Sequence, residues 1–292
     1  MTPSPSWYVA LGLFAIVASA VAWSRLVERD PVAGSTGGAA AANRVRRGEL
    51  AMIYFAGLAG GLIGAKLAFL LAEGWPHRTD WIALATGRSV TGALLGGYAT
   101  VELMKRLLGV RGATGDFFAI VAPLGIAIGR VGCVLQGCCA GVACDRLHWV
   151  GQWSPSVSWL LVDDAHGVAR WPAAQAELAF NVLFLGWVLA ARRFGWCTGN
   201  RFHVYLIAYG AFRFMHEFLR DVPPLHRDAL GALTGYQLVA IGMMVFGAVR
   251  YGQRRRAMNA MHDMHAALPA PPPSATGDAA STSDSHASEI AA

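Results

Sequence analysis

The chain has 292 residues, of which 55% are hydrophobic and only 14% are charged, and its formal net charge is +6. About 25% of the residues of a soluble domain are charged, and each ionised side chain in hydrocarbon costs several kcal/mol, so the composition excludes a soluble enzyme and indicates a membrane protein. The basic residues are not gathered on one water-exposed domain, which excludes a nucleic-acid partner.

Seven segments approach the roughly 20 predominantly apolar residues that a transmembrane helix needs. In chain order they are residues 7–23, 51–72, 89–104, 116–136, 173–191, 203–219 and 231–249. The third is short, glycine-rich and contains Glu102, and the fourth contains Pro123, which we expect to kink it. The predicted fold class is therefore all-α, a polytopic membrane protein of about seven transmembrane helices.

The connections between these segments differ in charge. Fifteen Lys and Arg residues lie after the first, third, fifth and seventh segments, and six lie in the other connections. Because positively charged connections stay in the cytoplasm, the N-terminus is predicted outside and the C-terminus in the cytoplasm. Basic residues follow rather than precede the first apolar segment, so we interpret it as a retained span and not as a cleaved signal peptide.

Composition also divides the chain into two regions. Residues 1–256 are predicted to form one integral membrane domain. Residues 257–292 are rich in Ala, Ser, Pro and Asp and are predicted to form a disordered cytoplasmic tail, because they cannot bury a core. Residues 32–43 are expected to be a flexible connection, and the chain has no internal repeat of the kind found in many transporters.

An ionisable residue inside a membrane span marks a candidate functional site. Arg130 lies toward the outer end of the fourth segment, in the sequence IGRVG. Gly129 and Gly132 clear space around it, so we expect its guanidinium group to approach a ligand or another stretch of backbone.

The sixth segment contains a second set of polar residues at helical spacing. Arg213 and Glu217 are four residues apart, with Tyr209 one turn before them and Arg220 about one turn after. In one interpretation Arg213 and Glu217 neutralise each other and lock the bundle. In the other, Arg130 and Arg213 face the phosphate of a phospholipid, which guanidinium groups bind through paired hydrogen bonds.

Three blocks of the sequence resemble bacterial prolipoprotein diacylglyceryl transferases. They are GDFFAIVAPLGIAIGRVGCVLQG at 115–137, AYGAFRFMHEFLRD at 208–221 and LTGYQLVAIGMM at 233–244, and their order and spacing follow the family. The resemblance implies a multi-pass protein of the bacterial cytoplasmic (inner) membrane, with seven spans. It implies transfer of a diacylglyceryl group from phosphatidylglycerol to the lipobox cysteine of a secreted prolipoprotein, a step of lipoprotein biosynthesis. We expect no cofactor.

The resemblance also implies roles for individual residues. Those expected to be catalytic are Arg130, Arg213 and Glu217. Those expected to bind substrate are Tyr8, Tyr209, Arg220, Gly129, Gly132 and Gly141.

At other positions the chain departs from the family. A histidine commonly regarded as part of the thiol-activating machinery is replaced by Thr91, and an asparagine and a glutamate of the signature are replaced by Cys133 and Cys138. Pro172 and Glu177 are kept in the segment WPAAQAEL. Two alternatives to transfer therefore stay open: a non-catalytic protein that binds anionic phospholipid on the same scaffold, and a thiol-redox membrane protein that uses the cysteines.

Four of the five cysteines lie within twelve residues, in the pattern C-x4-CC-x4-C from Cys133 to Cys144. Metal sites usually show two separated ligand pairs, and adjacent cysteines rarely bind one metal, so we predict no metal site. A disulfide from Cys138 or Cys139 to Cys144, packed free thiols, and a catalytic or carrier thiol all stay open. The predicted exposure of this segment to the oxidising outside favours the disulfide.

Overall fold

The computed structural model describes residues 5–29, 47–74, 79, 87–110, 112–143, 162–163, 167–220 and 233–266. Within these residues the chain forms seven α-helices, the number predicted from the sequence. They are α1 (Pro5–Arg29), α2 (Arg47–Phe69), α4 (Val90–Leu107), α5 (Gly115–Leu135), α8 (Ala173–Arg193), α9 (Arg201–His216) and α10 (Gly235–Ala266). A π-helical turn, η1 (Leu70–Gly74), extends α2, and a 3-10 turn, η4 (Glu217–Leu219), follows α9.

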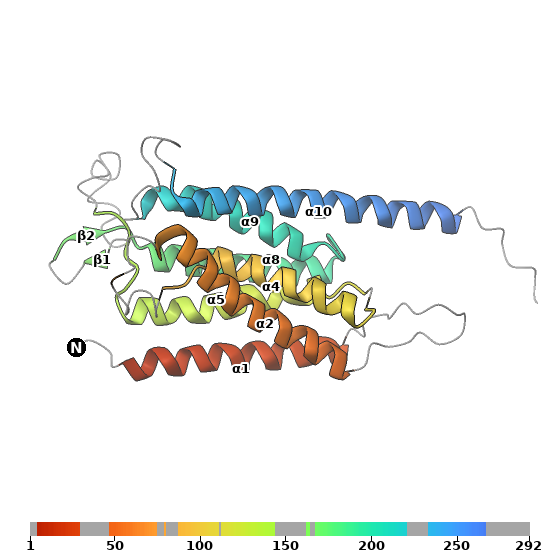
Figure 1. Ribbon diagram of the computed structural model, residues 1–292, viewed down its shortest axis with the longest axis horizontal. Coiled ribbons are helices and arrows are strands. Elements are labelled where there is room, and N and C mark those ends of the chain that lie inside the picture. The colour runs from red at the N-terminus through yellow and green to blue at the C-terminus, as the bar shows by residue number, and fades with distance from the viewer. Residues whose placement is uncertain are drawn as a thin grey trace, which may run out of the picture. The chain divides into compact units, whose positions relative to one another are not determined.

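Residues up to Gln253 form one unit, in which the helices lie lengthwise beside one another (Figure 1). Residues from Arg254 onward form a second unit. Because α10 ends at Ala266, residues 257–266 are helical, whereas the sequence predicted a disordered tail from residue 257. Residues 267–292 lie outside the described residues.

Four of the helices are long and apolar enough to cross a membrane: Ala10–Arg29, Arg47–Ala72, Gly115–Leu135 and Ala173–Arg193. The other three predicted spans are helical but less suited by length or composition. Helix α9 has only 16 residues, and the 18 residues of α4 include three charged ones near its end. The helical composition and the four apolar spans fit a polytopic membrane protein, and its orientation stays a prediction.

Glycines bring α2 and α4 into close contact. A Cβ atom added to Gly64 would collide with the backbone of Gly92 and of Gly96 on the facing helix. Small residues at such positions allow two backbones to approach, which is how helices commonly pack in a membrane. The glycine-rich third segment is therefore a packing surface, and it fixes the start of α4 beside the end of α2.

A short β-ribbon interrupts the helical fold. Strands β1 (Val162–Asp163) and β2 (Ala169–Arg170) pair antiparallel, which is a small departure from the all-α prediction. Isolated bridges join Gly141 to Arg220 and Ala143 to Arg170. The first bridge ties the segment after α5 to the segment after η4, and the second ties it to β2, at the end of the bundle that carries β1 and β2 (Figure 1).

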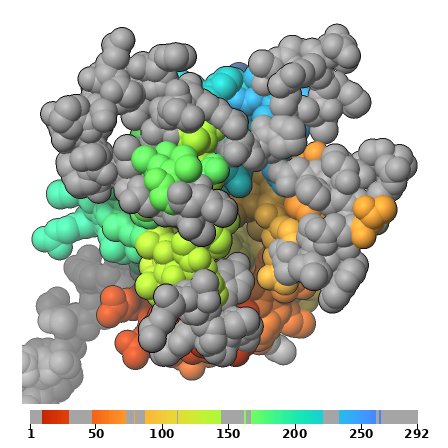
Figure 2. All heavy atoms as spheres, turned by 90° about the vertical axis from the view of Figure 1, so that its left-hand side faces the viewer, coloured from red at the N-terminus to blue at the C-terminus, as the bar shows by residue number. Residues whose placement is uncertain are grey.

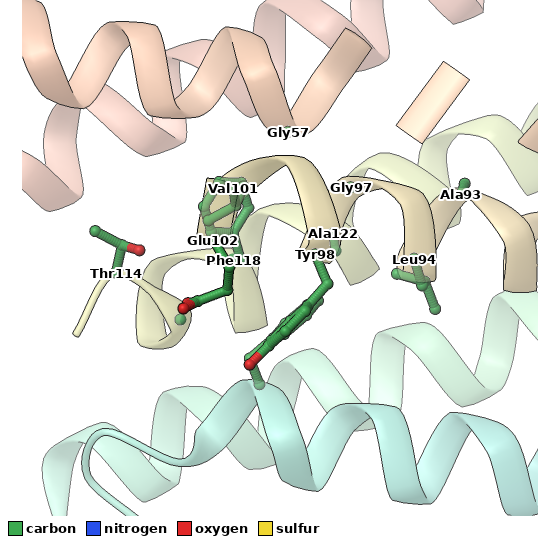
Figure 3. A pocket seen from close by; sticks show the side chains of 12 residues that line it. Gly57, Ala93, Leu94, Gly97, Tyr98, Val101, Glu102, Thr114, Phe118 and Ala122 are labelled. Carbon is green, nitrogen blue, oxygen red and sulfur yellow. The ribbon is translucent and has the colours of Figure 1, made fainter. Parts of the chain in front are cut away.

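At the other end of the bundle, away from β1 and β2, the end of α4 and the start of α5 carry structural polar contacts. Asp116 lies 2.8 Å from Arg201 Nη1 and accepts a hydrogen bond from the backbone of Gly199, which joins the start of α5 to the start of α9. Figure 3 shows a small cavity nearby, between Tyr98 and Glu102 of α4 and Phe118 of α5. Its volume of about 100 Å³ is well below the roughly 300–1,000 Å³ of ligand pockets.

Candidate functional site

A cavity of about 380 Å³ lies at the end of the bundle near the β-ribbon. Figure 2 faces this end, where the yellow-green residues of α5 and the following loop border a recess beside the gold residues of α4. The described lining residues are Phe69, Gly87, Arg88, Ser89, Val90, Ile126, Gly129, Arg130, Cys133, Cys139, Arg213, Arg220 and Tyr236. Four of them are arginines and none is a carboxylate, so the cavity is suited to an anion.

Arg130 is held at the cavity wall by a buried carboxylate on another helix. Its Nη2 atom lies 2.7 Å from Oε2 of Glu177, near the start of α8. The other carboxylate oxygen, Oε1, accepts a hydrogen bond of 2.8 Å from the hydroxyl group of Tyr209 on α9. Because Glu177 is only 2% exposed and both its oxygens have partners, it fixes Arg130 and Tyr209 in place.

A second carboxylate holds the two arginines at the end of α9. Glu217 Oε2 lies 2.9 Å from Arg213 Nη2 and 3.5 Å from Arg220 Nη1. Arg213 also lies over the ring of Tyr236, 5.7 Å from its centroid, and its buried Nη1 makes no hydrogen bond to the described residues. Both sequence interpretations therefore find support, since Arg213 pairs with Glu217 and also lines a cavity with Arg130.

The predicted stripe along α9 is only partly realised. The α-helix ends at His216, and Glu217 begins the 3-10 turn. Arg220 then has extended backbone, which turns it toward Gly141. Tyr209, the first member of the stripe, bonds to Glu177.

Gly141 contributes through its backbone. Its amide group donates a hydrogen bond of 2.8 Å to the carbonyl group of Trp171, and a Cβ atom there would collide with the carbonyl oxygen of Leu219. Only glycine fits between the backbone segments at Trp171 and Leu219, so Gly141 positions the segment that carries Arg220.

The other predicted glycines and Tyr8 have different outcomes. Gly129 lines the cavity, and a Cβ atom added to it would meet nothing within 4 Å, which agrees with open space beside Arg130. Gly132 is buried within α5. Tyr8 belongs to α1, but its side chain lies outside the described residues, so its role stays a prediction.

Thr91, at the position where the resemblance places the family histidine, is fully buried and is not among the described lining residues of the cavity. Its hydroxyl group lies 2.8 Å from that of Ser89, which caps α4 and does line the cavity. A buried threonine hydroxyl group bonded to a serine cannot serve as a base near neutral pH.

Cys133 and Cys138, where the resemblance places the family asparagine and glutamate, come together with a third cysteine, Cys139. The Sγ atoms of Cys133, Cys138 and Cys139 all lie within 4.8 Å of one another, and all three thiols are free. The turn that brings them together has positive φ at Gly137 (62°) and at Cys139 (61°). A positive φ is rare for residues other than glycine and is found where the surrounding structure imposes it, often at functional sites.

Neighbouring groups favour the thiolate form of Cys139. Hydrogen bonds from the thiols of Cys133 and Cys138 lower the pKa of Cys139, and the positive charges of Arg130 and Arg220 lower it further. Contacts with Cys133 and Cys139 raise the pKa of Cys138, whose thiol donates a hydrogen bond to the carbonyl oxygen of Cys133. Cys144, the predicted disulfide partner, lies outside the described residues.

Sequence reasoning did not include Glu177, Arg88, Ser89 and Tyr236 among the site residues. Glu177 carried a usable signal, because it is a carboxylate inside a predicted span and belongs to a segment kept from the family. Arg88 precedes the third predicted span and Ser89 is its first residue, and neither gave such a signal.

Comparison with known proteins identifies relatives of this chain. A protein from Solidesulfovibrio magneticus is 33% identical over 214 residues, covering 69% of this chain and 76% of that protein. One from Paracidovorax citrulli is 28% identical over 86% of this chain and 91% of its own length, and one from Coxiella burnetii is 29% identical over 82% and 87%. All three are phosphatidylglycerol–prolipoprotein diacylglyceryl transferases. The profile of prolipoprotein diacylglyceryl transferase matches residues 4–251, and the chain therefore belongs to that family.

Proposed function

We propose that the protein transfers a diacylglyceryl group from phosphatidylglycerol to the thiol of a prolipoprotein cysteine. The observation that carries this proposal is the cavity wall, on which four arginines and no carboxylate occur among the described residues. Family membership supports it, because the relatives described above are named for that transfer.

The arginines can act both on the phosphate of the substrate and on the leaving group of the reaction. Phosphatidylglycerol carries one phosphate, which Arg130 and Arg213 can bind through charge-assisted hydrogen bonds. Arg213 has a free donor for this purpose in its buried Nη1. When a thiolate attacks the glyceryl carbon that bears the phosphate ester, the carbon–oxygen bond breaks and glycerol phosphate departs. Guanidinium groups held in place by the buried carboxylates can stabilise the charge on that leaving group.

The acyl chains have an apolar surface beside this cavity. A second pocket, of about 260 Å³, lies among α1, α2, α4 and α5 and is lined largely by apolar side chains. Ile126 lines both this pocket and the arginine-lined cavity. A phospholipid with its phosphate at the arginines can therefore place an acyl chain against the apolar pocket.

Transfer can be tested with the purified full-length protein, phosphatidylglycerol and a peptide that contains a lipobox cysteine. The expected product is a peptide whose mass has increased by one diacylglyceryl group. Arg130→Gln and Arg213→Gln should each lower the rate by about 10²–10³-fold, as the loss of a transition-state donor does in other enzymes. Arg193→Gln, which removes an exposed charge at the end of α8, is the matched control and should keep the rate.

Complementation of a strain depleted of its own transferase gives an independent readout. Failure of the intact, well-expressed protein in both assays would overturn the proposal.

The second candidate is a non-catalytic protein that binds anionic phospholipid. It is favoured by Thr91, because the residue at the position of the family histidine is buried and cannot act as a base. This candidate predicts that phosphatidylglycerol co-purifies with the protein and is lost in Arg130→Gln, without any lipidated peptide. Detection of turnover excludes it.

A further inference from the structure

The three clustered thiols are the most unusual chemical feature of the cavity wall that phosphate binding does not explain. Cys133 is buried at the end of α5, whereas Cys138 and Cys139 are exposed in the turn that follows. Cys133 and Cys139 both line the cavity, beside Arg130, Arg213 and Arg220. The thiols and the phosphate-binding groups thus share one space.

The sequence alone predicted no metal site, but the folded turn places the sulfur atoms at a spacing close to that of one. Zinc–sulfur bonds are about 2.3 Å long, so two sulfur ligands of a tetrahedral zinc ion lie about 3.8 Å apart. The Sγ atoms of Cys138 and Cys139 are 3.8 Å apart, and all three Sγ atoms lie within 4.8 Å of one another. A movement of about 1 Å at Cys133 completes the geometry, which is within the reach of a side-chain rotation.

The surrounding charges also favour such a site. Three thiolates and one zinc ion carry a net charge of about −1. Arg130 Nη1 lies 3.7 Å from Cys133 Sγ and can neutralise that charge as an outer-shell partner. The left-handed backbone at Cys139 turns its thiol toward Cys138 and Cys133.

We propose that Cys133, Cys138 and Cys139 bind a zinc ion whose fourth coordination position opens to the arginine-lined cavity, where it takes up the thiol of the acceptor cysteine. Zinc sites with three protein ligands and one open position are typically catalytic. The binding of zinc stands on the thiol cluster alone, whereas the role in thiol activation rests on the proposed transfer.

The ion would supply the function that Thr91 cannot. A thiol that coordinates zinc loses its proton, here to water, and becomes the thiolate that is needed for attack. Its sulfur then forms a bond to the glyceryl carbon of phosphatidylglycerol while the carbon–oxygen bond to the phosphate breaks. The bonding electrons leave with glycerol phosphate, and neither the zinc nor any sulfur changes oxidation state.

Zinc binding can be measured on the full-length protein in detergent. The protein is reduced, stripped with a chelator and titrated with Zn²⁺ against a chromophoric competitor. The wild-type protein should take up one zinc per chain, and Cys133→Ser, Cys138→Ser and Cys139→Ser should each abolish this binding. Cys197→Ser removes a thiol in the turn before α9 and should leave it intact.

Cobalt substitution tests the open position. Co²⁺ in the site should show the visible absorption of a tetrahedral thiolate complex, and a lipobox peptide should change that spectrum. The same peptide with serine in place of the acceptor cysteine should not. An unchanged spectrum with the cysteine peptide overturns the open position.

The zinc site and the transfer reaction can fail separately. Zinc uptake that persists when all three cysteines are replaced, or a disulfide among them in protein isolated without reductant, overturns the metal site. Full transfer activity in the chelated protein overturns thiol activation but leaves the proposed transfer intact. Stoichiometric zinc without any transfer keeps the site and overturns the proposed function.

Discussion

Replacing Glu177 with glutamine tests whether this buried carboxylate organises the cavity. The change keeps the volume and removes the charge. Glu177 is 2% exposed, its Oε2 atom lies 2.7 Å from Arg130, and its Oε1 atom accepts a hydrogen bond of 2.8 Å from Tyr209. The amide of glutamine has a single oxygen, so either Arg130 or Tyr209 loses its acceptor, and the guanidinium group loses its counter-charge.

The expected cost follows from these contacts. Removing one member of a buried ion pair costs about 3–5 kcal/mol, and one retained hydrogen bond places Glu177→Gln near the lower end of that range. A loss of about 3 kcal/mol is roughly a hundredfold change in the unfolding equilibrium. Tyr209→Phe removes only one hydrogen bond to the carboxylate and should cost less, about 1.5–2 kcal/mol.

The measurement is reversible unfolding in mixed micelles as denaturing detergent is added. Glu28→Gln is the matched control, because Glu28 is exposed near the end of α1. Changes at exposed positions usually alter stability by less than about 0.5 kcal/mol, so the control should unfold near the wild-type midpoint. A Glu177→Gln protein as stable as the control would refute the reasoning.

Three further experiments test other features. Gly141→Ala places a methyl group against the backbone of Leu219, so we expect the free energy of unfolding to fall by about 1–3 kcal/mol. Displacement of Arg220 should also weaken phosphatidylglycerol binding. Unchanged lipid binding contradicts this role of Gly141. Gly64→Leu should separate α2 from α4 and lower the yield of folded protein, whereas Gly186→Leu on α8, where a Cβ atom meets nothing within 4 Å, should not. Alkylation of Cys139 in the metal-free protein should slow less between about pH 8 and about pH 6 than that of an ordinary cysteine, because neighbouring thiols and arginines lower its pKa below the usual value of about 8.5. A tenfold slowing per pH unit contradicts a stabilised thiolate.

The helices could be predicted from the sequence because long apolar segments have few alternatives in a membrane. The segment predicted at 116–136 is α5, Gly115–Leu135, and the one at 173–191 is α8, Ala173–Arg193. The end of α10 could not be predicted in this way. Its last turns contain no apolar periodicity that burial in lipid would require, and composition alone suggested disorder.

Site residues could be predicted where a charged side chain lies in a membrane span, because burying that charge costs free energy. Arg130 and Arg213 were recognisable because a membrane span rarely contains an arginine without a function, and both line the cavity. Their partners were harder to predict, since the pairing of Arg130 with Glu177 depends on how α5 packs against α8. The close approach of the three thiols depends on the left-handed backbone at Cys139, which could not be predicted from residue preferences.

The placement of the two carboxylates has a consequence for the end of the catalytic cycle. Glu177 and Glu217 pair with three of the arginines but do not line the cavity, so the four arginines of the described wall outnumber these two acids. Under the proposed transfer, the substrate is a phosphodiester with a single negative charge, and the departing phosphomonoester carries about −1.5 to −2 at neutral pH. The excess positive charge therefore favours the product over the substrate, and glycerol phosphate should act as a competitive inhibitor whose slow release limits turnover.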